Sequence, residues 1–408
     1  MPQAREEYSM KTNEYIEKTE QYVLHTYNRA PVVFEKGEGV YLYDTDGNEY
    51  LDFAAGIAVY ALGYNNPELN NAMKDQIDHL VHTSNLYYNI PLAHAAEKLV
   101  KATGLSKAFF TNSGTEAIEG AIKAARKYAW LKDGSTDHEI IAMNNSFHGR
   151  SMGALSVTGN EHYQEPFRPL IGGIRFADFN DLASVQAQIT DRTCAIILET
   201  VQGEGGIYPA DPAFLKGIRK ICDERDILLI LDEIQCGMGR TGYMFACDAY
   251  SVKPDIMTVA KALGCGIPVG AFVLNEKTAA HSLVPGDHGT TYGSNPFAAR
   301  AVSTVFDLFN KNHIVDHVRE LTPYLESTLD AIVKDFDIAA ERRGMGFMQG
   351  IVIRGTGVGD VVSAALGNGL VVISAGSDVL RLVPPLVITR DDIDEMARRL
   401  RKTLESLS

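Results

Sequence analysis

Short apolar runs alternate with helix-period spacers through the middle of this 408-residue chain. An apolar run of four to eight residues bounded by turn residues is typical of a buried strand, and apolar residues every three to four positions indicate a covering helix. Strands joined through such helices pair in parallel, because the helical crossover returns the chain to the same edge of the sheet. The sequence therefore predicts an α/β fold with a mostly parallel central sheet. Its predicted strands are residues 107–111, 139–143, 174–179, 194–200, 227–234, 256–261 and 270–274.

Both ends of the chain show a different, mixed pattern. Residues 39–53 alternate apolar and polar side chains around Asp46-Gly47, which predicts a β-hairpin. Residues 11–27 have sparse apolar positions, and we expect a short helix there that packs against another part of the protein. We predict a large domain over residues 65–305 and a smaller α+β domain built from residues 1–64 and 306–408. Further predicted helices are 67–80, 92–103, 117–129, 297–310, 315–336 and 390–407, and further strands are 348–354, 370–373 and 379–382.

The overall charge limits the partners that this chain can have. Its net charge of −14 argues against nucleic acid or an anionic membrane surface. No uncharged apolar run reaches the roughly 18 residues of a membrane-spanning helix, and Glu6 and Glu7 argue against a signal or transit peptide. The five cysteines, odd in number and without metal-ligand spacing, indicate reduced thiols. We therefore expect a cytoplasmic protein that binds small molecules and no metal.

Two predicted strands place an acid and an amine at their carboxyl ends. Residues 227–234 end in Asp232 and its neighbours, residues 256–261 end in Lys261, and a glycine-rich loop follows. Ligands of open α/β sheets bind in the crevice beyond these strand ends. A lysine there is either an edge residue that extends to water or a desolvated amine suited to Schiff-base chemistry. The nearby aspartate favours the catalytic interpretation.

The segment Ser113-Gly114-Thr115 joins a predicted strand to a predicted helix. A glycine turn at a helix start presents free backbone N–H groups, and the helix dipole favours an anion at that end. The two hydroxyl groups would add donors. An ordinary helix cap explains the same three residues, and on this segment alone that simpler interpretation is favoured.

Two further loops follow predicted strands at the same edge. One carries Phe147 and Arg150, which could stack on a ring and bind a carboxylate, although a loop phenylalanine is more often packed and a loop arginine more often solvated. The other carries Glu199 and Glu204, which could be solvated or could pair with Arg150 and Arg381. A hydrolase-type carboxylate pair of Asp232 and Glu199 is an alternative, but it would leave the lysine and the anion-binding turn without roles.

An anion-binding helix start, an aromatic ring, a strand-end aspartate and a strand-end lysine together suit a phosphorylated pyridine aldehyde. In sequence, these motifs are FTNSGTEA at 110–117, SFHGR at 146–150, DEIQ at 232–235 and AKALG at 260–264. They resemble the class III (ω-amino) aminotransferases, which use pyridoxal 5'-phosphate on the fold type I scaffold, and the similarity extends over nearly the whole chain. Within that family the resemblance includes the segment TSNLYY at 83–88.

The resemblance implies a role for each motif residue. Lys261 would be the Schiff-base lysine and the base that moves the proton, Asp232 would pair with the pyridinium nitrogen, and Phe147 would stack on the ring. Other cofactor contacts would come from Ser113, Gly114, Thr115, Gln235 and, across a homodimer with shared sites, Thr291. Substrate contacts would come from Arg150, Thr290, Arg381, Glu204 and Glu199.

The same resemblance implies a reaction. It would move the δ-amine of N2-acetylornithine to 2-oxoglutarate, giving N-acetylglutamate 5-semialdehyde and glutamate, a step of arginine biosynthesis. Ornithine, 4-aminobutyrate, succinylornithine or N-succinyl-diaminopimelate are alternative donors, and an aminomutase or a decarboxylase is an alternative activity. A movable pair of Glu204 and Arg381 would mask the arginine until the dicarboxylate arrives.

This sequence also departs from the usual family residues at four positions. Thr200 replaces proline, Cys265 replaces glycine and Ile118 replaces asparagine, and these changes concern loop rigidity and packing. Tyr60 lies in a segment that usually offers asparagine to the substrate, so the identity of the donor depends on it.

Overall fold

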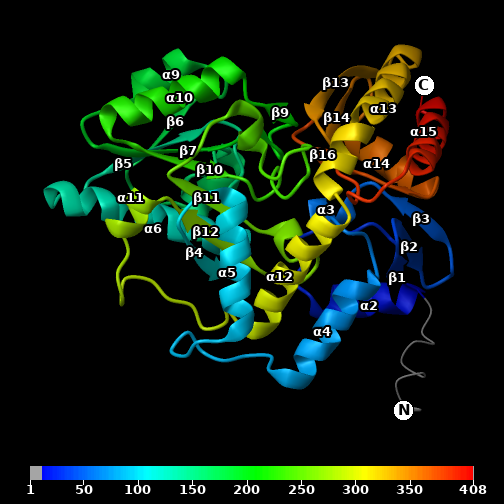
Figure 1. Ribbon diagram of the computed structural model, residues 1–408. Coiled ribbons are helices and arrows are strands. Elements are labelled where there is room, and N and C mark those ends of the chain that lie inside the picture. The colour runs from blue at the N-terminus through cyan, green and yellow to red at the C-terminus, as the bar shows by residue number, and fades with distance from the viewer. Residues whose placement is uncertain (1–11, 408) are drawn as a thin grey trace.

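The computed structural model describes residues 12–407, which fold into two lobes (Figure 1). The middle of the chain forms one lobe, and the first strands and the last helices form the other. Residues 1–11, which begin the predicted segment 1–64 and include Glu6 and Glu7, lie outside the described residues, as does residue 408. Within residues 12–407, no helix has the length and apolar character needed to span a membrane.

The larger lobe is built on a seven-stranded sheet. Its strands run in parallel except for β12 (Gly270–Leu274), which is antiparallel to both of its neighbours. A short glycine-rich loop rather than a helix leads into β12, so the chain turns back instead of crossing over. The predicted, mostly parallel sheet is confirmed. From one edge of the sheet to the other, the strand order is β4 (Lys107–Thr111), β12, β11 (Ile256–Val259), β10 (Leu228–Asp232), β7 (Thr193–Glu199), β5 (Glu139–Met143) and β6 (Ile174–Ala177).

The central strands are apolar at successive positions because both faces of the sheet are covered. Side chains alternate between the two faces of a strand. Ile140 and Ile230 pack in the cluster that contains the apolar face of α6 (Gly114–Asp133). Ile141 and Leu229 belong to the opposite cluster, which includes residues of α5 (Ile90–Thr103), α10 (Pro212–Arg225) and α12 (Pro296–Lys311).

Asparagine caps fix where several covering helices begin. Asn66, before α4 (Pro67–His79), accepts from two backbone N–H groups of the first turn, and Asn89 and Asn295 cap α5 and α12 in the same way. A proline follows each cap within two residues, where a missing N–H costs nothing. The predicted helices 67–80, 92–103 and 297–310 are confirmed to within two residues.

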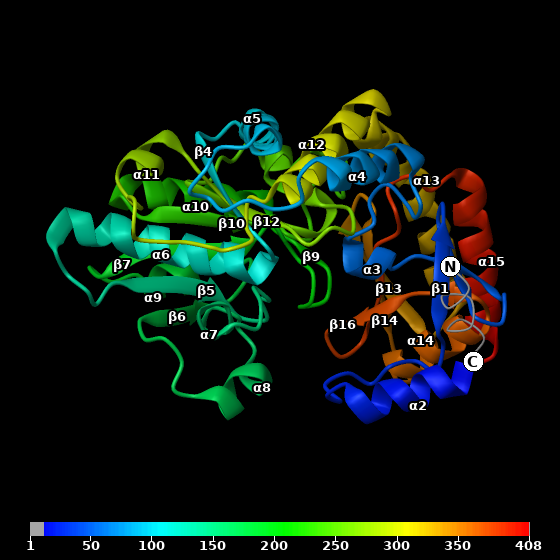
Figure 2. The ribbon, with the colours of Figure 1, turned by 90° about the horizontal axis from the view of Figure 1, so that it is seen from below.

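The smaller lobe unites both ends of the chain (Figure 2). β2 (Tyr41–Asp44) and β3 (Glu49–Asp52) form the predicted hairpin, with β1 (Phe34–Glu38) beside β2. β15 (Leu370–Val371) pairs in parallel with β3 through Leu370 and Leu51. The predicted smaller α+β domain built from both chain ends is confirmed, and its boundaries at 64 and 306 stay predictions. Two short helices are α3 (Ala55–Ala58), which follows β3, and α11 (Glu276–Ala280), which follows β12 in the large lobe.

A second sheet in this lobe faces the large lobe. Its order is β13 (Ala339–Met345), β14 (Met348–Ile353), β17 (Val379–Leu382) and β16 (Ile373–Ala375). β13 was not predicted, because this edge strand is largely polar and has no apolar run. The helix α14 (Val358–Gly367), short and bounded by glycines, was not predicted either, whereas α13 (Ile314–Asp335) and α15 (Arg390–Glu405) were.

The first described helix differs from expectation. α2 (Thr12–Tyr22) forms as predicted, but it has no buried residue. Its tie to the hairpin is a hydrogen bond of 2.6 Å between the hydroxyls of Thr12 and Thr45. One face of the helix, with Thr12, Tyr15, Ile16 and Thr19, is half-buried, so the helix contacts the rest of the chain only by partial burial.

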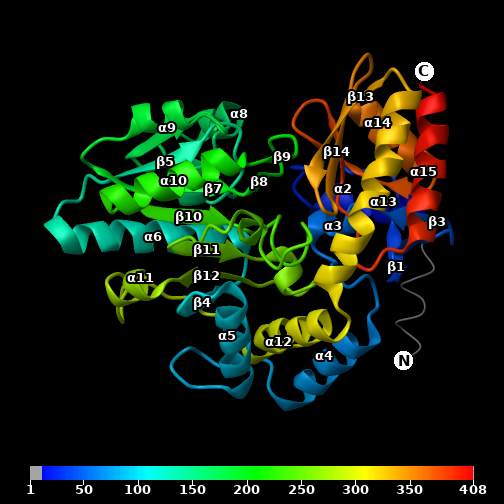
Figure 3. The same cartoon turned by 45° about the horizontal axis from the view of Figure 1, so that its top comes forward.

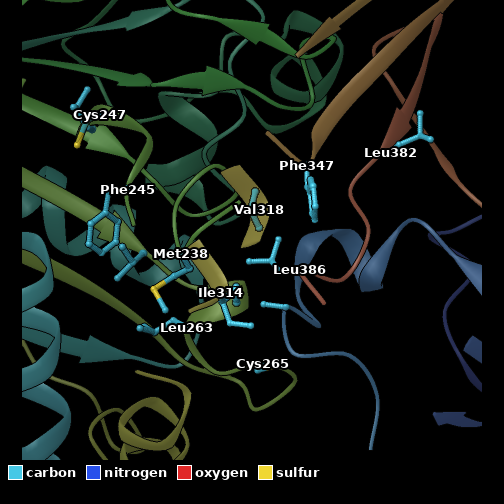
Figure 4. Packing of buried hydrophobic residues seen from close by; sticks show 14 of the residues in the cluster. Met238, Phe245, Cys247, Leu263, Cys265, Ile314, Val318, Phe347, Leu382 and Leu386 are labelled. Carbon is cyan, nitrogen blue, oxygen red and sulfur yellow. The ribbon is translucent and has the colours of Figure 1, made fainter. Parts of the chain in front are cut away.

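The two lobes share one hydrophobic core (Figure 4). Met238 and Leu263 come from the large lobe, Phe347 and Leu386 from the small lobe, and Ile314 lies at the start of α13. Because the same cluster of buried side chains extends through both lobes, it fixes the walls of any site between them.

A buried arginine lies in the joint between the lobes. Nη1 of Arg240 donates to the backbone carbonyls of Phe347, at 3.2 Å, and Pro384. Burial lowers the pKa of Arg240 to about 9. These contacts link a large-lobe turn to two segments of the small lobe.

Candidate active site

A cavity of about 510 Å³ lies beyond the carboxyl ends of β4, β5, β7 and β10. This edge of the sheet faces the small lobe (Figure 3). It is the position at which open α/β sheets bind ligands. The predicted site residues that line the cavity are Ser113, Gly114, Thr115, Phe147, Arg150, Glu199, Asp232, Gln235 and Lys261.

Lys261 lies on a strained turn rather than at a strand end. β11 stops at Val259, two residues earlier than predicted, and Lys261 has a left-handed backbone with φ of 49°. Such a conformation is costly for a residue with a side chain, and it occurs where the surrounding structure imposes it. The side chain borders the cavity and is otherwise enclosed by protein. Burial lowers the pKa of Lys261 to about 8, so a large share of the amine is unprotonated and nucleophilic in mildly alkaline solution.

Asp232 is held by partners on both carboxylate oxygens. Oδ2 lies 2.7 Å from Nδ1 of His148, and Oδ1 accepts from the backbone N–H of Ile234 at 3.0 Å and from the hydroxyl of Thr258 at 3.2 Å. Burial acts to lower the pKa of His148, but the hydrogen bond and the charge of Asp232 outweigh it and raise that pKa. The imidazole of His148 therefore fixes the position of the Asp232 carboxylate from behind.

The role of His148 was not predicted from the sequence. The residue stands in the SFHGR motif between Phe147 and Gly149, but a lone histidine in a loop carries no signal of its partner. Among the described residues, Nε2 of His148 has no hydrogen-bond partner. Only the fold brings this loop, which follows β5, against the end of β10.

Glu199 occupies the end of β7 beside these two residues. It accepts from the backbone N–H groups of Phe147 and Gly203, each at 3.3 Å. Burial raises the pKa of Glu199 to about 8. The idea that Glu199 pairs with an arginine is wrong, because backbone groups rather than a guanidinium satisfy its oxygens.

The helix start at Gly114 has the form of an anion cup. The side chain of Ser113 caps α6 by accepting the N–H of Glu116 at 3.3 Å. The interpretation of this segment as an ordinary helix cap is therefore correct for Ser113. The next residue, Gly114, borders the cavity. A Cβ on Gly114 would lie 2.9 Å from Cδ1 of Ile234, so a larger residue would have to displace the Ile234 side chain. The helix therefore begins with free N–H groups at the cavity wall.

Thr115 adds a hydroxyl group to this anion-binding helix start, and a series of hydrogen bonds holds that hydroxyl in place. Its Oγ1 lies 2.8 Å from Oγ of Ser151, and Ser151 donates to the carboxylate of Glu119 at 2.5 Å. Gly149, with φ of 133°, lets this loop approach, because a Cβ there would lie 2.3 Å from Oγ1 of Thr115. The threonine hydroxyl is thus held beside the helix start.

The buried Arg381 and the half-buried Glu204 form an ion pair next to the cavity. Nη1 of Arg381 lies 2.6 Å from Oε1 of Glu204 and Nη2 lies 3.1 Å from Oε2, which is a bidentate geometry. Nη1 also donates to Oε1 of Gln235 at 3.0 Å, and Nη2 donates to the carbonyl of Ser374 at 3.0 Å. Burial acts to raise the pKa of Glu204, but the charge of Arg381 outweighs it and lowers that pKa. The structure brings together this predicted pair.

Comparison with known proteins agrees with this set of residues. The family model for aminotransferase class-III matches residues 22–404. The chain belongs to the class-III aminotransferases. An acetylornithine aminotransferase of Clostridium acetobutylicum is 46% identical over 375 residues, which are 92% of this chain and 96% of that protein.

Solved structures agree with the same family. The ornithine aminotransferase of Toxoplasma gondii has a TM-score of 0.95 at 29% identity and covers 99% of this chain and 97% of its own. The N-acetylornithine aminotransferase of Stenotrophomonas maltophilia has a TM-score of 0.83 at 38% identity and covers 96% of this chain and 99% of its own. The resemblance stated from the motifs is confirmed, and so is the fold type.

Other predicted residues of this aminotransferase are placed differently. Arg150 is exposed at the cavity rim, with its guanidinium centre 3.5 Å from the ring centroid of Tyr163 and 5.5 Å from that of Phe147. The suggested pairing of Arg150 with a glutamate is therefore wrong, since aromatic faces rather than a carboxylate contact its guanidinium. This leaves its donors available at the rim.

Thr290 and Thr291 do not line the cavity. Thr290 accepts from Nδ2 of Asn112 at 3.4 Å and from the backbone N–H of Gly293 at 3.0 Å. Thr291 is exposed. Within one copy of the chain, both residues therefore stand outside the site they were assigned to.

Two of the four departures from family residues have evident structural roles. The hydroxyl of Thr200 donates to Oε1 of the buried Glu233 at 2.7 Å. Ile118 is fully buried in the core between α6 and the sheet. Both changes serve packing, as expected.

The other two departures face each other across the lobes. Sγ of Cys265 accepts the backbone N–H of Leu62 at 3.3 Å. The ring of Tyr60 lies 4.4 Å from that of Tyr64, and a Cβ on Gly266 would come within 3.0 Å of it. Tyr60 therefore supports the loop behind the cavity wall.

Proposed function

We propose that this aminotransferase binds pyridoxal 5'-phosphate in the 510 Å³ cavity. The residues present fit that group. The amine of Lys261 is enclosed and has a lowered pKa, the carboxylate of Asp232 is fixed from three sides, and the glycine cup suits a phosphate. When bound, the cofactor supplies an electron sink for the substrate carbon.

The protein's own groups have distinct tasks in this proposal. The amine of Lys261 holds the cofactor by a covalent bond and takes up or returns the proton at the substrate carbon. Asp232 keeps the ring nitrogen protonated, and His148 holds Asp232 in position. Phe147 covers one face of the ring, and Gln235 lies near the cofactor's phenolic oxygen. The phosphate is bound by Ser113, Gly114 and Thr115.

The donor that we propose is N2-acetylornithine, whose δ-amine passes to 2-oxoglutarate to give N-acetylglutamate 5-semialdehyde and glutamate in arginine biosynthesis. The observation that carries this proposal is the bidentate pair of Arg381 and Glu204 beside the cavity. While the pair is closed, Arg381 does not bind an α-carboxylate next to Lys261, so the donor presents its terminal amine. When the pair opens, Arg381 binds a carboxylate of 2-oxoglutarate. Similarity to the Clostridium acetobutylicum acetylornithine aminotransferase supports this donor.

Arg150 suits the far end of such a donor. It lies at the rim, and its guanidinium lies over the ring of Tyr163, which restricts its motion but leaves donors for a carboxylate. We assign it the α-carboxylate of acetylornithine, with Glu199 deeper in the site, and we expect Thr290 to approach the substrate only from the partner copy. Similarity to the Toxoplasma gondii ornithine aminotransferase makes free ornithine the second candidate donor.

We also propose that two copies share their active sites. Leu86, Tyr87, Tyr88 and Ile90 are exposed, at 84%, 68%, 105% and 75%, next to the segment that contains Thr291. Large apolar side chains grouped in this way mark an interface. A second copy that covers them would place Thr291 at its partner's phosphate. The five buried, unpaired cysteines support a cytoplasmic location.

A panel of amino donors with 2-oxoglutarate held constant tests the proposed reaction. The ratio kcat/KM should be highest for N2-acetylornithine, and ornithine, succinylornithine and 4-aminobutyrate serve as comparisons. A higher value for ornithine would replace the proposed donor. Borohydride treatment of the loaded enzyme should fix the cofactor on Lys261, and a protein that stays colourless with the cofactor would refute the proposal for the cavity.

A further inference from the structure

Glu204 lies in a loop that has little conformational rigidity of its own, because it is rich in glycine. β8 (Val201–Gln202) and β9 (Tyr208–Pro209) form a two-residue ribbon, and the loop between them contains Gly203, Gly205 and Gly206 around Glu204. Glycine loses more conformational freedom on folding than any other residue. The position of the Glu204 carboxylate must therefore be set by contacts from outside the loop.

Apart from the hydrogen bond of Gly203 to Glu199 in the large lobe, these contacts come from the small lobe. The backbone N–H of Gly376 donates to the carbonyl of Glu204 at 2.8 Å. Nε of Arg343 donates to the carbonyl of Gly206 at 2.7 Å, and its guanidinium centre lies 3.8 Å from the ring centroid of Tyr208. Figure 3 shows the β8–β9 ribbon extending from the large lobe toward β14.

Arg343 and Arg381 belong to one row of the small-lobe sheet. Arg343 on β13 pairs with Gly350 on β14, and Gly350 pairs with Arg381 on β17. Directly paired residues project from the same face of a sheet, so the two arginines stand on one face about 10 Å apart, two strand spacings. Between them, Gly350 leaves room for Ile207, whose Cβ would lie 3.1 Å from a Cβ at that position.

The whole loop therefore lies over this row. At one end Glu204 meets Arg381, in the middle Ile207 lies over Gly350, and at the other end Gly206 meets Arg343. One sheet thus carries both Arg381, which Glu204 masks, and Arg343, which holds the loop of Glu204 in place. Arg343 forms no ion pair with any of the residues 12–407, so its contacts to the loop have no competing carboxylate.

We propose that Arg343 is a positioning residue that holds the loop so that Glu204 masks Arg381. This inference rests on the proposed function, in which the pair of Glu204 and Arg381 opens for a dicarboxylate. If Arg343 stabilises the closed arrangement, in which Glu204 pairs with Arg381, its loss raises the population of the open arrangement. Any dicarboxylate that needs Arg381 then binds more tightly.

Glutarate is a suitable probe, because it carries two carboxylates but has no keto group to accept an amine. Its dissociation constant is measured by calorimetry on the cofactor-loaded enzyme, so the readout does not depend on turnover. Arg343→Met removes the hydrogen bond to Gly206 and the cation over Tyr208. Loss of one hydrogen bond of ordinary net strength changes an equilibrium by about three- to tenfold, and we expect glutarate to bind tighter by that factor.

Arg342 provides the matched control. It is the neighbour of Arg343 on β13 and faces the other side, where it donates to Asp330 at 2.6 Å and to Gln349 at 2.9 Å. Arg342→Met should leave glutarate binding unchanged. Arg343→Lys keeps a cation but not the Nε–H donor, so it should shift glutarate affinity in the same direction by a smaller factor, and it serves if Arg343→Met does not fold.

Comparison with Glu204→Gln separates this inference from the proposed function. Glu204→Gln should tighten glutarate binding, and adding Arg343→Met to it should change nothing more, because Arg343 acts through Glu204. An equal gain from Arg343→Met in both backgrounds, or a gain from Arg342→Met, overturns the inference. If Glu204→Gln tightens binding and Arg343→Met does not, the inference fails alone. If neither does, the masking proposal fails and the inference fails with it.

Discussion

Replacement of Lys261 by methionine tests by how much the enclosed amine lowers the free energy of unfolding. Methionine keeps most of the length of the side chain and removes the charge. Burial lowers the pKa of Lys261 from 10.5 to about 8 in the folded protein. Each pH unit of that difference corresponds to about 1.4 kcal/mol, so the charged amine costs about 3 kcal/mol, and water in the cavity reduces this to about 2–3 kcal/mol. The cofactor-free variant should therefore be more stable than the natural protein at pH 7.

The pH dependence identifies the charge as the cause. Below pH 8 the amine is protonated in both the folded and the unfolded state, so the full cost is present. Between pH 8 and 10.5 the folded state releases its proton while the unfolded state keeps it, and the stability of the natural protein rises. By pH 10 the advantage of Lys261→Met should fall below about 1 kcal/mol.

Scanning calorimetry of the two cofactor-free proteins measures this difference. For a chain of 408 residues, 2–3 kcal/mol corresponds to an increase in Tm of about 2–4 °C at pH 7. Lys220→Met is the control, because the side chain of Lys220 is 74% exposed and should show no such gain. A gain at pH 7 that persists undiminished at pH 10 would refute the reasoning, since packing rather than charge would then be responsible.

Four other changes have defined outcomes. Asp232→Asn should lower kcat by about a hundredfold while the cofactor still attaches, because an amide cannot keep the ring nitrogen protonated; stopped-flow half-reactions measure this. His148→Phe should lower kcat by about tenfold and move the pH profile of the cofactor's absorption, and an unchanged profile would show that His148 only fills space. Gly114→Ala should weaken cofactor binding in equilibrium dialysis, and Ile234→Ala should restore part of it by removing the atoms nearest to the new Cβ. The rate at which the cofactor attaches to apo-protein should rise with pH to a plateau with a midpoint near 8, because only the unprotonated amine of Lys261 attacks.

The sheet could be predicted because its strands carry their own signal. β10 and β7 are buried on both faces, so their apolar runs are continuous and hard to mistake. β13 escaped prediction because it is a half-exposed edge strand that needs no apolar run, and it contains the polar Arg342 and Arg343. Thus the elements that make the scaffold were predictable, whereas one that supports the masked arginine was not.

The site divides in the same way. Asp232, Lys261 and the Ser113-Gly114-Thr115 turn each follow a strand, so topology alone brings them to one edge. His148 and the stacking of Arg150 on Tyr163 depend on how one loop folds back on another, which no local pattern specifies. The pairing of Glu204 with Arg381 was implied by the family resemblance, because the residues alone left Glu204 either solvated or paired with Arg150 or Arg381.

The pairing of β15 with β3 also sets an order of events during synthesis. About 300 residues separate these two strands, so at about 5–20 residues per second the first hairpin waits some 15–60 s for its partner strand. In that interval the seven strands of the large sheet, with Asp232 and Lys261, have already left the ribosome. The half of the cavity that would hold a cofactor is therefore made first, and the half that contains Arg381 arrives last. A nascent chain thus contains the residues proposed to hold and activate the cofactor before it contains the arginine proposed to select the substrate.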